Sequence, residues 1–447
     1  MRLNAVGLAG IAATLLEGTS AAALPEPQWE NWSGNQKHTP IEAPSPKVDY
    51  AVSLGPRPYY IIQNMTDGPL KSKLQSCENG PFSVTGWSVG HRGGGTLLVP
   101  EETSESLHAG ARMGSGVLEC DVAFTADRGL VCRHDLCDLH RTTDILVRSD
   151  LAGKCTTPFT PANDTASATA VCCTSDITLA EFESLRSRMD GANTSAVTPE
   201  DYISGGIPDW RTELYNTWGQ VLTLETYIDL VDSLPGYRNF TPELKTPPDA
   251  VPMPFNGYTQ EQYARDMIET FIRKGIDPNR VFAQSFNPPD IFQWIAEYPE
   301  FGKHAVYLDE DGDTAEDFAA AVARLPELKA QGVNIIAPPF NYLLTTTDDN
   351  STIIPSSYAT AANEAGLAII AWSFERSGPL ANVLANDDYY YNTFAGAVHS
   401  DGQFFEVLDV LAQQANVSAL FTDWSATVTY YANCFGLTGV YGEQFSL

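Results

Sequence analysis

The chain has 447 residues, of which 43% are hydrophobic, and this length accommodates one barrel with additions or two domains. Asp and Glu number 56 against 26 Lys and Arg, which gives a formal net charge of −30. This excess of acids argues against binding to nucleic acids and against charge attraction to anionic membranes. A site for an anionic substrate would therefore need a local region of positive potential.

The first 23 residues have the features of a secretory signal peptide. Arg2 is followed by a mostly apolar stretch over residues 5–16, and Ala21-Ala22-Ala23 offers a small-residue cleavage site. No later run is long and apolar enough to span a bilayer. The sequence therefore predicts a secreted, extracellular protein without a transmembrane segment.

Cysteines and glycosylation triplets fit the same compartment. An even number of cysteines in a secreted chain predicts disulfides. The eight are Cys77, Cys120, Cys132, Cys137, Cys155, Cys172, Cys173 and Cys434, and those from 137 to 173 predict a stapled loop. Seven Asn-x-Ser/Thr triplets are candidate glycosylation sites, at Asn31, Asn64, Asn163, Asn193, Asn239, Asn350 and Asn416. Asn239 is the weakest of them because it lies close to a candidate site residue.

Residues 24–80 are rich in Pro, Asn and Ser and are predicted to form an N-terminal extension lying over the domain at 81–447. In that domain, strand-like segments alternate with helical patterns such as 258–275 and 313–332. The strand-like segments are 82–90, 116–124, 129–133, 239–244, 280–285, 304–309, 333–337, 367–373 and 418–422. The segment 129–133 is expected to pair as a hairpin with the second strand, which leaves eight. Eight alternating units predict a parallel sheet closed into a barrel.

An insertion at 136–222 interrupts the predicted barrel. It contains the cysteine cluster and a Trp-rich piece, PDWRTELYNTWG. Because it follows a strand end that carries candidate site residues, we expect it to form a lid or wall at the mouth of the barrel. The alternative is an insertion that does not contact substrate.

Polar residues gather at the ends of several predicted strands. Glu119 and Asp121 lie two apart in VLECDVAF, so they share one face of a strand while Cys120 faces away. Glu243 and Lys245 repeat this spacing on a later strand. Paired carboxylates are hard oxygen ligands that suit Mg²⁺ or Ca²⁺ better than zinc.

Two histidines and an arginine complete the pattern. His91 and His134 are suited to acid and base catalysis because imidazole titrates near working pH. Arg92 offers a planar fork of donors for phosphate oxygens. Together with the acids, these residues indicate metal-assisted phosphodiester chemistry.

The order of these motifs resembles the glycerophosphodiester phosphodiesterase family. The matching motifs are HRG at 91–93, PEET at 100–103, the Glu-x-Asp pair at 119–121, HD at 134–135 followed by LHRTTD, and ELK at 243–245. Weaker strand-end similarities are AQSF at 283–286, AWSF at 371–374 and FTDW at 421–424. The resemblance covers roughly residues 82–430.

The resemblance implies an α/β fold, a TIM-type (β/α)8 barrel with its site at the carboxyl ends of the strands. It implies hydrolysis of small phosphodiesters such as glycerophosphocholine, in which a substrate hydroxyl attacks phosphorus and water then opens a cyclic phosphate. The implied roles are acid and base for His91 and His134, phosphate binding for Arg92 and Lys245, and one divalent cation, Ca²⁺ or Mg²⁺, on Glu119, Asp121 and Glu243.

Three further residues have open roles. Glu101 is expected to orient Arg92 or the metal ligands, and Asp135 to orient a neighbouring group rather than to react. Trp372, at the end of a predicted strand, is expected to lie against the alcohol of the substrate or in the core.

The chain departs from the family pattern at three positions, with Glu102 in place of Asn, Ser373 in place of Thr and Ser425 in place of Pro. None removes a candidate ligand or histidine, so they affect substrate choice more than reaction type. Two alternatives stay open: a phospholipase-D-like enzyme acting on sphingomyelin or lysophospholipids, with an apolar approach surface in the insertion, and a catalytically silent barrel.

Overall fold

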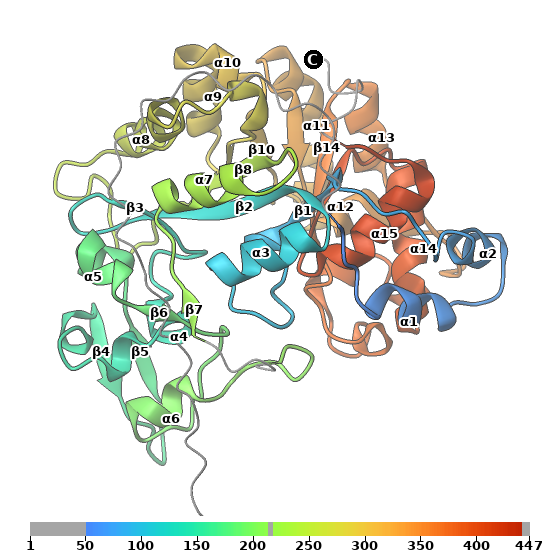
Figure 1. The fold of residues 1–447 in the computed structure, drawn as a ribbon. Coiled ribbons are helices and arrows are strands. Elements are labelled where there is room, and N and C mark those ends of the chain that lie inside the picture. Colours follow the sequence, from blue (N-terminus) through green and yellow to red (C-terminus); the bar gives the residue numbers. More distant parts are fainter. Residues whose placement is uncertain (1–50, 213–217, 440–447) are drawn as a thin grey trace, which may run out of the picture. The chain divides into compact units, whose positions relative to one another are not determined.

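A closed barrel of eight parallel strands forms the centre of the computed structural model, which describes residues 51–212 and 218–439 (Figure 1). In order around the barrel the strands are β1 (Thr85–Gly90), β2 (Ser115–Phe124), β8 (Asn239–Leu244), β9 (Gln284–Ser285), β10 (Val306–Leu308), β11 (Ile335–Ala337), β14 (Ala368–Phe374) and β15 (Ala419–Thr422). Strand β1 pairs with both β15 and β2, which closes the ring. The predicted TIM-type barrel is confirmed.

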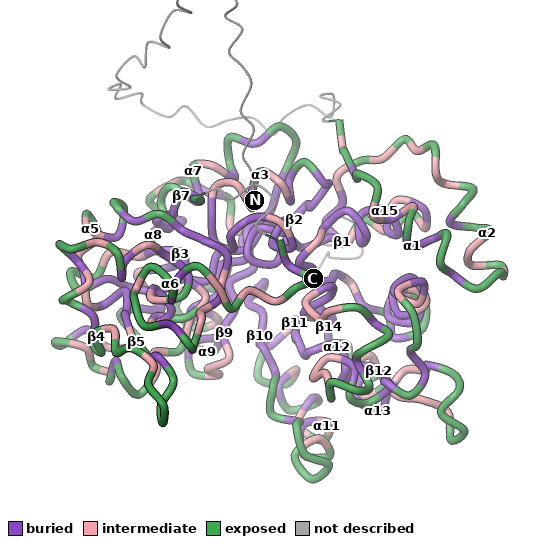
Figure 2. The backbone as a smooth tube through the Cα atoms, turned by 90° about the horizontal axis from the view of Figure 1, so that it is seen from below, coloured by how far each residue is buried: buried purple, intermediate pink, exposed green. Residues whose placement is uncertain are grey.

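The strands are apolar because both of their faces are buried (Figure 2). Inside the barrel, an apolar cluster is contributed by alternate residues of successive strands. It comprises Val89, Val117, Phe282, Val306, Leu308, Ile335, Ala337, Ile370, Ala419 and Phe421. A second, larger apolar cluster includes residues of both the strands and the surrounding helices.

Helices follow the strands along the chain. They are α3 (Ser104–Arg112), α7 (Leu224–Ser233), α8 (Gln260–Arg273), α9 (Pro288–Glu297), α10 (Pro299–Gly302), α11 (Ala315–Ala330), α12 (Phe340–Leu343), α13 (Ser357–Glu364), α14 (Phe404–Asp409) and α15 (Ser425–Phe435). Threonine hydroxyls cap α3, α8 and α11, since Thr103, Thr259 and Thr314 each accept a backbone N–H of the first turn. The helices expected at 258–275 and 313–332 are α8 and α11.

Strand β3 (Leu130–Cys132) is antiparallel to β2, which confirms the expected hairpin. A disulfide joins Cys120 of β2 to Cys132 of β3. Cys120 therefore uses the face of β2 that is opposite to its two acidic neighbours in sequence.

The insertion after β3 forms small elements of its own. They are α4 (Leu139–Thr142), β4 (Thr157–Thr160), β5 (Thr169–Val171), α5 (Leu179–Glu183), β6 (Arg186–Ser187), α6 (Pro199–Ile203) and β7 (Gly219–Gln220). Disulfides Cys137–Cys173 and Cys155–Cys172 confirm the stapled loop.

The described part of the extension contains α1 (Arg57–Gln63) and α2 (Pro69–Gln75). Ile61 and Ile62 are fully buried, and the disulfide Cys77–Cys434 joins this segment to α15. The candidate signal peptide, the site at Asn31 and the rest of the extension up to residue 50 lie outside the described residues. None of the helices in the described ranges has the length and apolar character needed to cross a bilayer.

Candidate active site

Strand register brings three acids together at the carboxyl end of the barrel. In the parallel pair β2–β8, Asp121 lies opposite Glu243, and Glu119 lies two residues before Asp121 on the same face. Carboxylate oxygens of Glu119, Asp121 and Glu243 all lie within 4.8 Å of one another. The next pairing, β8–β9, places Gln284 beside Glu243, and the Gln284 amide donates to Glu119 Oε1 at 2.8 Å.

The three acids are buried and close together, and both conditions change their pKa values. Burial and the neighbouring carboxylates raise the pKa of Glu119, and that of Glu243 to about 8. Burial acts the same way on Asp121, but Lys245 and Arg92 outweigh it and lower its pKa. Lys245 Nζ lies 2.6 Å from Glu243 Oε1. Among the described residues, no hydrogen-bond donor reaches either carboxylate oxygen of Asp121.

His91 directly follows β1, and two side chains contact its Nδ1 atom. Its Nδ1 lies 2.5 Å from Asp423 Oδ1 and 2.8 Å from Ser373 Oγ, while Nε2 lies 3.9 Å from Glu119 Oε2. Burial lowers the pKa of His91 to about 4, although Asp423 acts in the opposite direction. The ring is thus held neutral, with Nε2 on the side of the acids.

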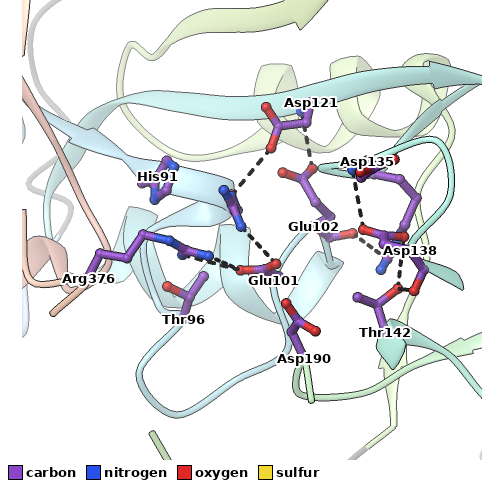
Figure 3. Close-up of polar contacts among 12 residues, drawn as sticks. His91, Thr96, Glu101, Glu102, Asp121, Asp135, Asp138, Thr142, Asp190 and Arg376 are labelled. Carbon is purple, nitrogen blue, oxygen red and sulfur yellow. Dashed lines mark hydrogen bonds and ion pairs between the residues drawn. The ribbon is translucent and has the colours of Figure 1, made fainter. Parts of the chain in front are cut away.

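Arg92 adopts a left-handed backbone conformation, with φ of 49°, at the turn that follows β1. Its backbone N–H donates to Glu119 Oε2 at 2.7 Å. Its guanidinium donates to Glu101 at 2.9 Å and lies 3.5 Å from Asp121. Glu101 is also in contact with Arg376 (Figure 3). Arg92 therefore connects two of the candidate acids, and Glu101 contacts Arg92 itself.

Two arginines that the sequence motifs did not indicate join this cluster. Arg376, after β14, lies 3.0 Å from Asp423 Oδ2 and 3.4 Å from Glu101 Oε2. Arg211, from the insertion, donates to Asp423 and lies 3.6 Å from Glu101. The insertion thus reaches the partner of His91.

A cavity of about 450 Å³ opens above these residues. It is lined by His91, Arg92, Glu119, His134, Glu243, Lys245, Thr246, Gln284, Phe286, Leu308, Glu310, Trp372, Arg376, Tyr390 and Phe421. Burial lowers the pKa of His134 well below its usual value, and nearby Arg92 and Lys245 act in the same direction. Asp135 is not part of the lining. It is exposed, and its carboxylate accepts the backbone N–H of Cys137 at 2.7 Å.

A family model described as the glycerophosphoryl diester phosphodiesterase family matches residues 91–425. The chain belongs to this family. It is accordingly a phosphoric diester hydrolase, and the resemblance inferred from the motifs is confirmed.

Individual proteins are similar to parts of this phosphodiesterase. A protein of Arthroderma benhamiae named "Extracellular protein" is 45% identical over 251 residues, which are 56% of this chain and all of that one. Glycerophosphodiester phosphodiesterase GDPD6 of Arabidopsis thaliana is 21% identical over 365 residues, covering 78% of this chain and 89% of its own. The crystal structure of a putative glycerophosphoryl diester phosphodiesterase from Silicibacter pomeroyi superposes with a TM-score of 0.50 at 18% identity, covering 82% of this chain and 99% of that one. This last likeness is one of fold.

Two of the three departures from the family pattern touch the site. Glu102 is buried with φ of 59°, and its carboxylate accepts the backbone N–H of Asp121 at 3.3 Å. Ser373 contacts His91, as described above. Ser425 instead supports the turn after β1, where its hydroxyl donates to Gly94 O at 3.1 Å.

Three of the four residues missed by sequence reasoning lie within or near motifs that were recognised. Asp423 and Gln284 are inside FTDW and AQSF, where a polar residue at the end of a barrel strand was the available signal. Arg376 lies two residues after AWSF. Arg211 carried no signal, because its role depends on how the insertion folds back.

Proposed function

We propose that this enzyme hydrolyses glycerophosphodiesters, such as glycerophosphocholine, to an alcohol and glycerol phosphate, with one divalent cation, Ca²⁺ or Mg²⁺. The observation that carries the proposal is the convergence of Glu119, Asp121 and Glu243 within 4.8 Å, beside His91 and in a cavity that His134 also lines.

The residues present fit a divalent cation. Asp121 has two buried oxygens that no donor of the described residues reaches, and burial together with the neighbouring carboxylates raises the pKa values of Glu119 and Glu243. Carboxylates also outnumber cationic side chains around the cavity. The acids are Glu101, Glu102, Glu119, Asp121, Glu243, Glu310 and Asp423, and the cationic side chains are Arg92, Arg211, Lys245 and Arg376. A cation held by Glu119, Asp121 and Glu243 would offset this charge and polarise the phosphoryl oxygens.

The hydrogen bonds of His91 support a role as the base in proton transfer. Because Asp423 occupies Nδ1, the free lone pair of the neutral ring is on Nε2, which makes His91 the base that accepts the proton of the attacking hydroxyl. His134 is the proposed acid that donates a proton to the oxygen of the leaving alcohol, and the negative charge of the bound phosphate would favour its protonated form against the effect of burial. Arg92 and Lys245 bind the phosphate oxygens.

We further propose that the first attacking group is the glycerol 2-hydroxyl. Its oxygen bonds to phosphorus as the bond to the alcohol breaks, and the cyclic phosphate is opened by water in the reverse proton sequence. A 2-deoxy analogue of the substrate tests this step. It should not react if the 2-hydroxyl is the nucleophile, and normal turnover would show that water attacks directly.

The first test is hydrolysis of glycerophosphocholine by the purified mature protein with Ca²⁺, with Mg²⁺ and with EDTA. We expect cation-dependent release of choline and glycerol phosphate, and a loss of about 100-fold or more in His134→Ala and Glu119→Gln. The exposed Glu316→Gln is the matched control. Undiminished turnover in EDTA would contradict the cation, and full activity of His134→Ala would contradict the acid.

A second readout does not depend on turnover. Addition of Ca²⁺ or Mg²⁺ should raise the melting temperature of the wild type, because the cation relieves repulsion among buried carboxylates. Glu119→Gln and Glu243→Gln should reduce this rise. An equal rise in both variants would mean that the cation binds elsewhere.

A phospholipase-D-like activity is the second candidate. Trp210 and Trp218 of the insertion are 39% and 45% exposed, which offers an apolar approach surface for a lipid. Comparing glycerophosphocholine with lysophosphatidylcholine separates the two activities. Faster cleavage of the acylated substrate would favour the second.

We also propose that the protein is secreted and glycosylated after removal of residues 1–23. Four disulfides and a relative named as extracellular support secretion. Asn64, Asn163, Asn350 and Asn416 are exposed, whereas Asn239 is buried in β8. Mass spectrometry of the secreted protein should find a mature N-terminus at Leu24 and glycans at exposed sites, with Asn239 unmodified.

A further inference from the structure

Three aromatic side chains line the cavity that also holds the acids. The acids belong to β2 and β8, and His91 follows β1. Phe286 follows β9, Trp372 lies in β14, and Tyr390 lies in a short 3-10 helix (Tyr389–Tyr391). In the order around the barrel, β14 lies opposite β8, whereas β9 lies next to β8. Since the rings line the same cavity as Glu119 and Glu243, a substrate whose phosphate lies at the acids can place its other end against them.

The three rings form a wall with defined geometry. Trp372 meets Phe286 with centroids 5.8 Å apart and planes at 86°, and it meets Tyr390 at 6.1 Å and 86°. The Trp372 Nε1–H donates to Ala337 O at 2.7 Å, and Tyr390 stacks on Phe340 at 5.5 Å. These contacts fix the positions of Trp372 and Tyr390. All three rings are partly exposed and line the cavity.

A carboxylate lies beside this wall. Glu310 lies two residues after the end of β10, lines the same cavity as the rings and is exposed. Lys245 lies 6.0 Å from the centroid of Phe286, but its ammonium group is paired with Glu243 at 2.6 Å. Arg376, which also lines the cavity, is paired with Asp423 at 3.0 Å. Among the described residues of the lining, Glu310 is therefore the carboxylate whose negative charge has no ion pair.

Aromatic faces together with a carboxylate form an environment that attracts an alkylammonium group. Resting on the proposed hydrolysis of glycerophosphodiesters, we infer that Phe286, Trp372, Tyr390 and Glu310 bind the cationic end of the leaving alcohol. The preferred substrates are then diesters of quaternary or other alkylammonium alcohols. The net charge of such a substrate is zero, which also reduces its repulsion by a chain of charge −30.

An acyl chain is the competing occupant of an aromatic wall. Two features favour the cation. A hydrocarbon chain packed against Glu310 would remove solvent from a carboxylate without offering it a partner. The whole cavity, including the phosphate end, has a volume of about 450 Å³, which suits a head group better than a long chain.

The test compares kcat/KM for three diesters at about 150 mM salt, where long-range charge effects are screened. The substrates are glycerophosphocholine, its neutral isostere with a 3,3-dimethylbutyl alcohol, and glycerophosphoglycerol. We expect the choline diester to exceed the isostere by about 10-fold, since the two differ in charge and hardly in shape.

Variants of the wall locate the effect. Glu310→Gln and Tyr390→Leu should each reduce the choline-to-isostere ratio by about 3- to 10-fold. Tyr390→Phe keeps the ring and should retain the ratio. A ratio that falls in Tyr390→Leu and not in Tyr390→Phe is then due to loss of the ring. Glu316→Gln, an exposed acid of α11 outside the cavity, is the charge-matched control. Calorimetry with choline chloride should show binding to the wild type that weakens in Glu310→Gln.

The outcomes are distinguishable. If none of the three diesters is hydrolysed, the proposed function fails, and the calorimetry alone decides whether the wall binds a cation. If all are hydrolysed at equal rates, the function stands and the cation site is overturned. Preference for the isostere or for an acylated substrate would overturn it in favour of an apolar or acyl site.

Discussion

His91 follows the first strand of the barrel, and the carboxylate that holds it, Asp423, follows the last strand. Asp423 contacts His91 on one oxygen and two arginines on the other. These arginines lower the pKa of Asp423 despite its burial, so it is an anion that orients the ring and keeps Nε2 available. Its effect on the reaction is exerted through His91.

Replacing this carboxylate should therefore reduce turnover more than substrate binding. We expect Asp423→Asn to lower kcat by about 100-fold, because the ring loses the partner that fixes its tautomer. Ser373→Ala, which removes the weaker contact to the same nitrogen, should lower kcat by less than about 10-fold. Steady-state kinetics, with circular dichroism to check folding, measures both. Equal kcat in wild type and Asp423→Asn would show that His91 needs no partner.

Asp138, at the start of α4, provides a pH-dependent term in stability. Burial raises its pKa to about 7, while Arg133 acts in the opposite direction. Since the folded state holds the proton more tightly than the unfolded state, the wild type loses stability as pH rises from about 4 to about 7. The ionised side chain costs the folded state about 4 kcal/mol at most.

Asp138→Asn should remove this dependence. The amide oxygen can still accept the backbone N–H of Asp135, which Asp138 accepts at 3.3 Å. We expect the variant to melt at a higher temperature than the wild type at pH 8 and at a similar temperature at pH 4.5. Thermal melts across this range measure the difference. A difference independent of pH would show that Asp138 does not titrate in this window.

At the scale of elements, Arg211 links the insertion to the candidate site. It donates to Asp423, and a second cavity of about 540 Å³ lies between the insertion and Arg376. Arg376 lines both this cavity and the cavity of the candidate site. The insertion therefore contacts the residues that hold His91, and we propose that it forms a wall beside the site.

Arg211→Gln should lower kcat/KM by about 10-fold, because a charge-assisted hydrogen bond to Asp423 is lost. The melting temperature should change little, since the insertion keeps its two disulfides. Arg186→Gln, an exposed arginine of β6, removes the same charge from the same insertion and should have no effect. Equal loss in both variants would indicate that only the charge of the insertion matters.

At the scale of the whole molecule, the net charge of −30 opposes the approach of anions. The local arginines are already paired with acids, so they do not reverse this field at long range. Salt screens the repulsion over distances longer than about 8 Å at physiological ionic strength.

Raising the salt concentration from about 10 to about 150 mM should therefore increase kcat/KM for glycerophosphoglycerol, which carries one negative charge. The increase should be smaller for glycerophosphocholine, whose net charge is zero. Initial rates at several salt concentrations measure both slopes. A decrease for the anionic substrate would mean that local attraction outweighs the field of the chain.

The sequence by itself determined the barrel, its hairpin, the stapled insertion and the order of the site motifs. Alternating strands and helices are a local pattern, and Glu119 and Asp121 share a face because strands have a period of two. The register that pairs Asp121 with Glu243 and the choice of cysteine partners were decided only by the tertiary structure. The contacts of Asp423, Arg211 and Arg376 and the aromatic wall were also decided only by the tertiary structure, because they join separate elements of the chain and have no short-range signature.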